Sequence, residues 1–211
     1  MDVRVTVLGA TGRTGGPLLE QVLASGHEPT ALVRTPSKLG SMADRVRVLE
    51  GDVRDPQRVH EAVEGAGAVL SVLGPAKGDG GDLLTVAARN VVRAMSSAGV
   101  RRLVLLTGAG VRDAEDRPKL VDRVFVALLT LVDRRRLRDS ERAVAEIRAS
   151  DLDWTVVRAP RLTDGARTGE YRVSYVGPDS GVRVARADVA SFMLRELADR
   201  SWSRRMPVVS S

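Results

Sequence analysis

The stretch VRVTVLGATGRTGGPLLEQVL, residues 3–23, joins an apolar run typical of a buried strand to a helical pattern through three glycines. Gly9, Gly12 and Gly15 follow the strand pattern and open the helical one. A nucleotide pyrophosphate bound at such a turn needs a tight bend, a backbone without a nearby Cβ, and the free N–H groups of a helix N-terminus. A second predicted strand follows within about 30 residues, which distinguishes a nucleotide loop from an ordinary glycine turn. The stretch therefore predicts a nucleotide site.

Three polar residues of this loop join the glycines as candidates. Thr11 and Thr14 can donate hydroxyl hydrogen bonds to phosphate oxygens, and Arg13 lies between them. The glycine spacing is Gly-x-x-Gly-x-x-Gly, whereas many dehydrogenases have Gly-x-Gly-x-x-Gly. The loop alone therefore does not choose between the nicotinamide dinucleotides.

Strand and helix patterns alternate along the chain. The predicted strands are nearly continuous runs of Val and Leu, at residues 3–9, 28–34, 45–51, 68–74, 101–108 and 153–160. The predicted helices between them are residues 14–25, 56–64, 81–98 and 118–149. Continuous apolar strands are buried on both faces, which is typical of a parallel sheet between two helical layers. The predicted fold class is α/β, a doubly wound parallel sheet or Rossmann fold.

No linker or internal repeat divides the 211 residues, so we expect one dinucleotide-binding domain over residues 1–211. The pattern loosens over residues 161–185, which are rich in Gly, Thr and Arg and contain one predicted strand at 171–177. We expect this region to be a small extension of loops on the substrate side. A helix at 186–199 and a last strand in RMPVV follow it.

Composition excludes several classes of protein. The chain has no cysteine, which excludes disulfides and thiolate chemistry. The apolar stretch 124–132 is far shorter than the ~20 residues that cross a bilayer. Charged residues interrupt the first apolar run, unlike a signal peptide, so we expect a cytoplasmic protein that contacts no membrane. The net charge of +6 comes from scattered arginines interleaved with acids, so we expect no nucleic-acid partner.

The end of the second predicted strand indicates which dinucleotide binds. NAD sites usually carry Asp or Glu there, on the ribose 2′-hydroxyl, whereas this chain has Arg34. An arginine fork can pair with the 2′-phosphate of NADP and stack on adenine. Lys38 can add a second positive charge, so the predicted cofactor is NADP(H). The ends of the third and fourth strands would line the same crevice with Asp52, Val53, Leu73 and Gly74.

Five stretches of the chain follow one another in the order of a known family: residues 7–34, 51–55, 88–111, 150–165 and 185–197. Together they resemble the atypical short-chain dehydrogenase/reductases of the NAD(P)H-binding, NmrA-like kind, and among these the flavin reductase (biliverdin reductase B) branch. The resemblance implies NADPH bound by the loop and crevice residues, with Thr107 beside the nicotinamide as an orienting residue. It also implies that the loop after the sixth strand frames the nicotinamide with Ala159, Pro160, Arg161 and Leu162.

The substrate side departs from that branch. Flavin reductases carry a histidine ahead of the sixth strand, where this chain has LRDSERAVAE with Arg138 and Ser140. The segment 116–136 also looks longer and more apolar. We take Pro75, Arg138 and Ser140 as substrate-side candidates. We expect a monomer, or a homodimer that forms through a helix at 118–136.

No side chain of the sequence qualifies as a tuned acid or base. Ordinary short-chain dehydrogenases use a Tyr–Lys pair four residues apart, but neither Tyr171 nor Tyr175 precedes a lysine at that spacing. His27 and His60 are expected at the surface. Reduction of a flavin, quinone or tetrapyrrole needs no such group, because the charge spreads over the flat conjugated acceptor. We expect NADPH-dependent hydride transfer to such an acceptor, without a metal. The alternative is a non-catalytic NmrA-like NADP(H) sensor that acts through a protein partner.

Replacement of Arg34 tests the choice of cofactor. Arg34→Ala removes a charge-assisted contact to the 2′-phosphate, so NADPH affinity should fall by ~2–3 kcal/mol while NADH affinity stays nearly unchanged. Calorimetric titration with both dinucleotides measures the two effects. Equal affinities of the wild-type protein for NADPH and NADH would overturn the assignment.

Overall fold

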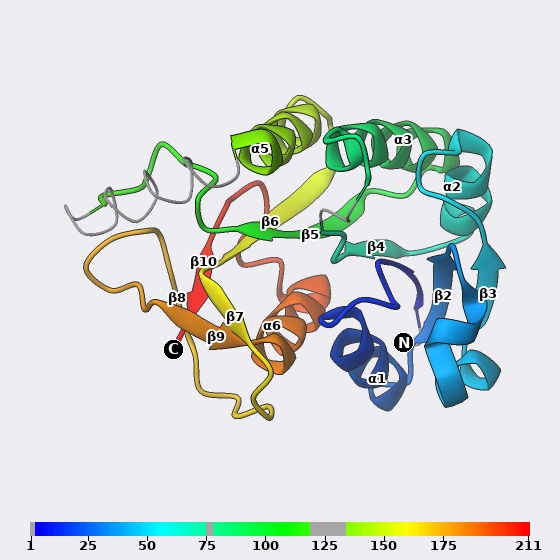
Figure 1. Ribbon diagram of the computed structural model, residues 1–211, viewed down its shortest axis with the longest axis horizontal. Helices are drawn as coiled ribbons and strands as arrows, with labels where there is room; N and C mark the ends of the chain where they lie inside the picture. The colour runs from blue at the N-terminus through cyan, green and yellow to red at the C-terminus, as the bar shows by residue number, and fades with distance from the viewer. Residues whose placement is uncertain (1–2, 75–77, 119–133) are drawn as a thin grey trace.

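The computed structural model describes residues 3–74, 78–118 and 134–211. Within these ranges the main sheet has the strand order β3-β2-β1-β4-β5-β6-β10-β8 (Figure 1). Its neighbours pair in parallel except β8, which runs antiparallel to β10. The order of the first six strands is that of a Rossmann fold, which confirms the predicted fold class. The strands are β1 (Arg4–Leu8), β2 (Glu28–Val33), β3 (Arg47–Glu50), β4 (Ala68–Ser71), β5 (Arg102–Gly108), β6 (Asp153–Ala159), β8 (Arg172–Ser174) and β10 (Val208–Ser210).

Helices cover both faces of this sheet, with α2, α3 and α5 on one face and α1 and α6 on the other (Figure 1). The helices are α1 (Gly15–Ala24), the 3-10 helix η1 (Pro36–Arg45), α2 (Pro56–Val63), α3 (Leu83–Ala98), α5 (Arg134–Arg148) and α6 (Arg186–Asp199). Each face has its own apolar core. Along β1, Val5 and Val7 belong to the core under α1 and α6, and Leu8 belongs to the opposite core. This burial on both sides explains the nearly continuous Val and Leu of the strands.

Residues 161–185 are more ordered than the predicted loop region. They contain β7 (Arg161–Thr163) and β9 (Arg183–Ala185), which pair in parallel as a second, two-stranded sheet. They also contain β8, the one strand that the sequence predicts there. Strands of three residues are too short to show a period, and their partners are distant in sequence, so the pattern missed β7 and β9.

Several predictions fall on residues outside the described ranges. Of the helix predicted over 118–149, the structure describes α5. Residues 119–133 lie outside the described ranges, and with them most of the predicted dimer interface at 118–136. Pro75, a substrate-side candidate, also lies outside them.

A fully buried arginine connects β6 to the segment that follows β5. Arg158 has no exposed side-chain surface and donates two hydrogen bonds to the carboxylate of Asp116, at 2.6 and 2.7 Å. Its guanidinium also donates to the carbonyl oxygens of Val111 and Met206. Asp116 accepts a further hydrogen bond from the backbone N–H of Val176, at 3.1 Å. Four separate segments of the chain therefore meet at this ion pair.

The ion pair has a definite pH dependence. Burial raises the pKa of Asp116, but hydrogen bonds from Arg158 and from backbone N–H groups outweigh this effect, so the pKa lies below its ordinary value. A carboxylate with a lowered pKa stabilises the fold at pH values above its unfolded pKa. That contribution is lost as the pH falls through the lowered, folded-state pKa.

Removal of the Asp116 charge tests this contribution. Asp116→Asn leaves the Arg158 guanidinium buried without a countercharge, so the free energy of unfolding at pH 7 should fall by about 3 kcal/mol. Urea unfolding of both proteins should show a difference that persists down to about pH 4 and shrinks below it. Asp199→Asn is the control, because Asp199 pairs with Arg195 on the exposed surface and should contribute little. A difference that grows on acidification would contradict the account.

Candidate functional site

The turn between β1 and α1 has no room for a side chain at two of its three glycines. Gly9 has a φ of +86°, and a Cβ there would lie 2.9 Å from the carbonyl carbon and oxygen of Val72. A Cβ on Gly15 would overlap the carbonyl groups of Gly9 and Ala10. The loop is thus packed against the end of β4 and against itself, and this packing fixes where α1 begins.

Gly12 has a different role, because its Cβ position is nearly open. The one close neighbour is the carbonyl oxygen of Gly9 at 3.2 Å, and Gly12 lines a crevice. At the adjoining start of α1, Thr14 makes no side-chain hydrogen bond to the helix, and the first turn carries no acidic residue. The helix start therefore has no acidic or capping side chain of its own, which suits a bound phosphate.

The crevice runs along the carboxyl ends of β1 to β4 and has a volume of about 160 Å³. Eight of the predicted cofactor residues line it: Gly9, Thr11, Gly12, Arg34, Asp52, Val53, Leu73 and Gly74. Five residues that the sequence patterns did not single out complete its lining: Leu32, Val33, Gly51, Val72 and Leu83. These five lie at strand ends or at the start of α3, and only the fold brings them to the crevice.

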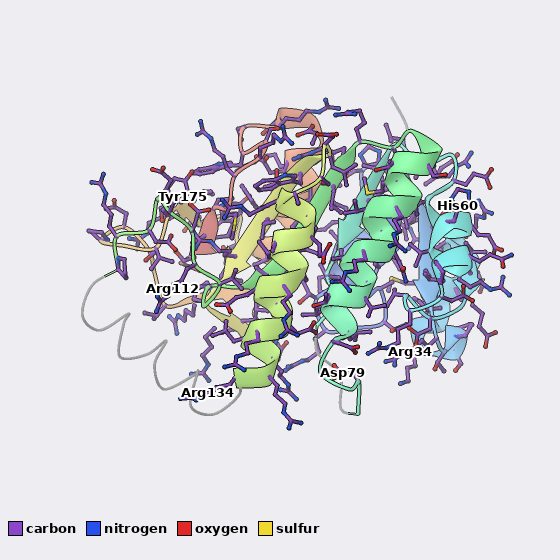
Figure 2. All side chains as sticks on the ribbon, turned by 90° about the horizontal axis from the view of Figure 1, so that it is seen from above. Arg34, His60, Asp79, Arg112, Arg134 and Tyr175 are labelled. Atoms are coloured by element: carbon purple, nitrogen blue, oxygen red, sulfur yellow. The ribbon has the colours of Figure 1, made fainter. Side chains whose placement is uncertain are left out.

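Arg34 lies at the edge of the crevice. Its side chain is 63% exposed, and its Nη1 atom is 4.0 Å from Oδ2 of Asp52. An exposed pair at this distance contributes little to stability, so the guanidinium can take a stronger anionic partner such as a phosphate. In Figure 2, Arg34 lies at the same end of the molecule as Asp79 and Arg134, where α3 and α5 begin.

Nine predicted cofactor residues do not line the crevice, and four of these lie in the glycine loop or in η1. Arg13 is exposed, whereas Thr14 and Gly15 are buried in the loop. Lys38 is exposed in η1, four residues beyond Arg34. Their assignment to the dinucleotide therefore stays a prediction.

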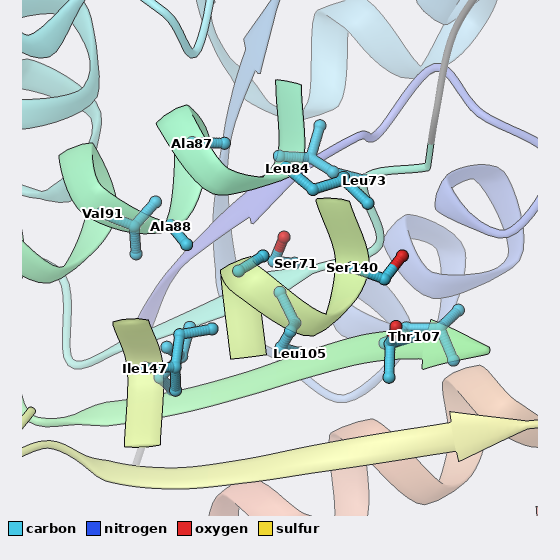
Figure 3. Close-up of a pocket in the computed structure, with 13 residues that line it drawn as sticks. Ser71, Leu73, Leu84, Ala87, Ala88, Val91, Leu105, Thr107, Ser140 and Ile147 are labelled. Atoms are coloured by element: carbon cyan, nitrogen blue, oxygen red, sulfur yellow. The ribbon is translucent and has the colours of Figure 1, made fainter. Parts of the chain in front are cut away.

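A second pocket, mostly apolar, lies between the sheet and helices α3 and α5 (Figure 3). Its volume is about 20 Å³, room for about one water molecule. Thr107 at the end of β5 and Ser140 on α5 both line it, and Leu73 lines this pocket as well as the crevice. The structure thus brings three predicted residues together at the end of β5. The rest of the lining is Ser71, Leu84, Ala87, Ala88, Val91, Leu103, Leu105, Leu106, Ala143 and Ile147.

Arg138 does not join Ser140 at this pocket. It is exposed on α5, whereas Ser140, two residues further on, is half-buried and lines the pocket. Residues two apart do not share a helix face, which accounts for the difference. Ser140 therefore lies at the pocket and Arg138 in solvent, and the substrate-side role of both stays a prediction.

The end of β6 lies beside the end of β5. Ala159 pairs in register with Gly108, one position beyond Thr107, and its carbonyl oxygen accepts a hydrogen bond from the N–H of Ala109 at 2.8 Å. Pro160 is half-buried next to this pair. The next two predicted residues belong to β7: Arg161 is exposed, and Leu162 packs against the core under α1 and α6.

One buried residue of this region escaped the sequence patterns. Asp139 on α5 is 3% exposed. Its carboxylate accepts hydrogen bonds from the backbone N–H groups of Leu84 and Thr85, at 2.9 and 3.0 Å, and from the Thr85 hydroxyl at 2.6 Å. Both partners lie in the first turn of α3, more than 50 residues away in sequence. No local pattern could have indicated this contact.

Within residues 3–74, 78–118 and 134–211, no cluster of His, Cys, Asp and Glu could bind a metal ion. His27 precedes β2 at the opposite edge of the sheet, where its Nδ1 accepts a hydrogen bond from the N–H of Val3. His60 lies on α2 (Figure 2). Both are partly buried, and neither lines the crevice or the pocket. The helices of these ranges include none with the length and hydropathy of a membrane span.

The sequence model of the NAD(P)H-binding family matches residues 9–200. The chain therefore belongs to the NAD(P)H-binding family, and its cofactor is a nicotinamide dinucleotide. This agrees with the glycine loop, the open Gly12 and the uncapped start of α1.

Two known proteins illustrate the relationship in sequence. The uncharacterized protein YwnB of Bacillus subtilis is 26% identical over 190 residues, which cover 88% of this chain and 84% of YwnB. The 3-diazoavenalumate denitrifying reductase of a Streptomyces species is 35% identical over 190 residues, 81% of this chain and 59% of that enzyme. This chain therefore spans less than two thirds of the Streptomyces enzyme.

Solved structures share the fold. A short-chain dehydrogenase/reductase from Veillonella parvula in complex with NADP superposes with a TM-score of 0.83 and 21% identity, over 100% of this chain and 95% of that chain. ChuY, an anaerobilin reductase from Escherichia coli O157:H7, superposes with a TM-score of 0.82 and 24% identity, over 98% and 96% of the two chains. At this level of identity the likeness establishes the Rossmann-type architecture.

Gly12→Val separates dinucleotide binding from folding. The valine side chain would project into the crevice without meeting the core, so NADPH binding should be lost while the urea unfolding midpoint changes little. Fluorescence titration with NADPH and circular dichroism measure the two properties. Gly16→Ala is the matched control, because a Cβ on Gly16 has no neighbour within 4 Å. It should keep full affinity. A folded Gly12→Val protein that still binds NADPH as the wild type does would show that the loop is only structural.

Proposed function

We propose that this protein is an NADPH-dependent reductase that transfers a hydride to a flat conjugated acceptor such as a flavin, a quinone or a tetrapyrrole. One observation carries the proposal: the dinucleotide crevice and the mostly apolar pocket adjoin through Leu73 at the carboxyl ends of the strands. Ligands of open parallel sheets bind at this edge. The chain therefore offers a crevice of mixed polar and apolar lining beside a mostly apolar pocket. The interior of the pocket, about 20 Å³, is smaller than the acceptor, which would lie at its end beside Thr107 and Ser140.

The residues of the crevice fit NADPH in particular. The glycine loop and the start of α1 would hold the pyrophosphate, Asp52 and Val53 would flank the adenine, and Arg34 would pair with the 2′-phosphate. When bound, NADPH supplies the hydride. The protein then has to bind and orient the reactants, and Thr107 and Ser140, two of the polar side chains that line the pocket, would orient them.

The positions of the two tyrosines bear on the kind of acceptor. Tyr171 packs edge-on against Phe192, and Tyr175 against Trp202, and neither tyrosine lines the pocket. Burial raises the pKa of Tyr175, so its hydroxyl is a poorer acid than a free phenol. A ketone would need a proton donor for its developing alkoxide. A conjugated acceptor delocalises the charge and can take its proton from water.

The names of two similar proteins support the reaction class. One is a denitrifying reductase and the other an anaerobilin reductase. The preference for a conjugated acceptor comes from the pocket and from the absence of any tyrosine or histidine in the described lining of the crevice and the pocket. The names add only that reduction occurs among similar proteins.

A non-catalytic NADP(H) sensor that acts through a protein partner is the second candidate. It is favoured by the exposed surface of α5, where Arg134, Arg135, Arg138 and Arg142 form no ion pair with any residue that the structure describes. An acidic protein surface could bind there. The missing acid is compatible with both candidates, so turnover decides between them.

NADPH oxidation against a panel of flavins, quinones and tetrapyrroles is the deciding assay. A reductase should consume NADPH faster than the uncatalysed reaction with at least one acceptor. Its rate should lack a steep dependence on pH between about 6 and 8, because neither histidine lies at the pocket. Tight dinucleotide binding without turnover of any acceptor would favour the sensor.

Point variants test the roles within the reductase. Tyr171→Phe and Tyr175→Phe should leave kcat within about threefold, under ~1 kcal/mol in barrier. Thr107→Val should cost more, because it removes a hydroxyl that lines the pocket. A large loss of kcat in either tyrosine variant, with the fold intact, would show that a tyrosine acts as a proton donor.

A further inference from the structure

The first turn of α3 is capped by a residue of another helix. Asp82 stands at the N-cap position of α3 but makes no side-chain hydrogen bond to the helix. Its carboxylate lies 2.6 Å from Nη2 of Arg54 instead. The carboxylate of Asp139 on α5 accepts hydrogen bonds from the N–H groups of Leu84 and Thr85 in its place. A helix start needs such acceptors, and here α5 supplies them.

The hydrogen bonds of Asp139 account for its burial. A carboxylate removed from water is costly unless hydrogen bonds and nearby positive charge compensate. Asp139 has two backbone N–H groups, the hydroxyl of Thr85 and the positive end of the α3 dipole. Its contact with α3 is therefore directional, because an altered position of either helix would weaken several hydrogen bonds together.

The residues next to this contact line both cavities. Leu83 lines the dinucleotide crevice, and Leu84 lines the mostly apolar pocket. Ser140, the neighbour of Asp139, lines the same pocket from α5, as Figure 3 shows. The carboxylate thus connects the two helices at the end of the pocket where Thr107 and Ser140 lie. The pocket has room for about one water molecule, so an acceptor would lie against its end, beside Thr107 and Ser140, where small shifts of these walls change its position.

We infer that Asp139 is a positioning residue that sets the spacing of α3 and α5 beside the pocket, and so determines how an acceptor is held at the pocket end where Thr107 and Ser140 lie. The inference rests on the proposed reductase function. Asp139 itself does not line either cavity. Asp139 affects the acceptor indirectly, because its hydrogen bonds to α3 hold Leu84 and Ser140 in place at the pocket.

Three variants test this role. Asp139→Asn keeps one acceptor oxygen and replaces the other with an amide N–H₂ group that cannot accept from a backbone N–H. Thr85→Val removes only the hydroxyl donor. It provides a second test of the same contact if Asp139→Asn folds poorly. Glu146→Gln is the matched control, because Glu146 joins α5 to Arg89 of α3 through an exposed ion pair away from the pocket.

Each variant is compared with the wild type by three readouts: hydrogen exchange at the amides of Leu84 and Thr85, NADPH affinity, and kcat and KM for FMN and for a two-ring quinone. In Asp139→Asn, exchange at these amides should quicken by about tenfold or more. The ratio of kcat/KM values for the two acceptors should change by about fivefold or more, mainly through KM. NADPH affinity should stay within about threefold. Thr85→Val should shift the ratio in the same direction by less, and Glu146→Gln should shift neither exchange nor the ratio.

The possible failures are distinct. A wild-type protein that reduces neither these acceptors nor the wider panel overturns the proposed function, and the acceptor role of Asp139 with it. An active wild type whose acceptor ratio is unchanged in Asp139→Asn and Thr85→Val overturns the inference alone. Equal shifts in Glu146→Gln and Asp139→Asn would also overturn it, because any contact between α3 and α5 would then have the same effect.

Discussion

The packing of Gly9 and Gly15 in the turn between β1 and α1 is the constraint on which the site depends. A Cβ at either position would collide with backbone atoms, which cannot move aside as a flexible side chain could. With glycine at both positions, α1 begins directly at the carboxyl end of β1. This places a helix start without a capping side chain at the edge where the ends of β1 to β4 converge. The crevice, and a helix start there that suits a bound phosphate, follow from this placement.

Two carboxylates, those of Asp116 and Asp139, stabilise the side of the site away from the glycine loop, although neither lines the crevice or the pocket. Asp116 pairs with Arg158 and holds the segment that follows Thr107 against β6. Asp139 holds the start of α3 against α5. The crevice combines glycines and apolar strand ends with the polar or charged Thr11, Arg34 and Asp52, whereas the pocket is lined mostly by Leu, Val and Ala. Rigid support from buried carboxylates and mostly apolar walls are consistent with a site that orients its ligands and leaves the chemistry to the cofactor.

The sequence predicted those parts of the molecule that local patterns determine. Continuous Val and Leu runs indicated the parallel strands, and the glycine spacing indicated the loop whose Gly9, Gly12 and Gly15 the structure shows in distinct roles. Contacts between distant segments could not be predicted. The pairing of β7 with β9 and the capping of α3 by Asp139 join residues that have no local signature. Arg138 and Ser140 were equal candidates in sequence, and only the direction of α5 separates them.

A crystal structure of the protein with NADP⁺ tests the central claim most directly. The account predicts the pyrophosphate at the backbone N–H groups of the glycine loop, the 2′-phosphate at Arg34, and the nicotinamide at the end of β5 beside Thr107. It would be contradicted by a dinucleotide whose pyrophosphate lies away from the glycine loop, or whose nicotinamide lies away from the pocket that Thr107 and Ser140 line.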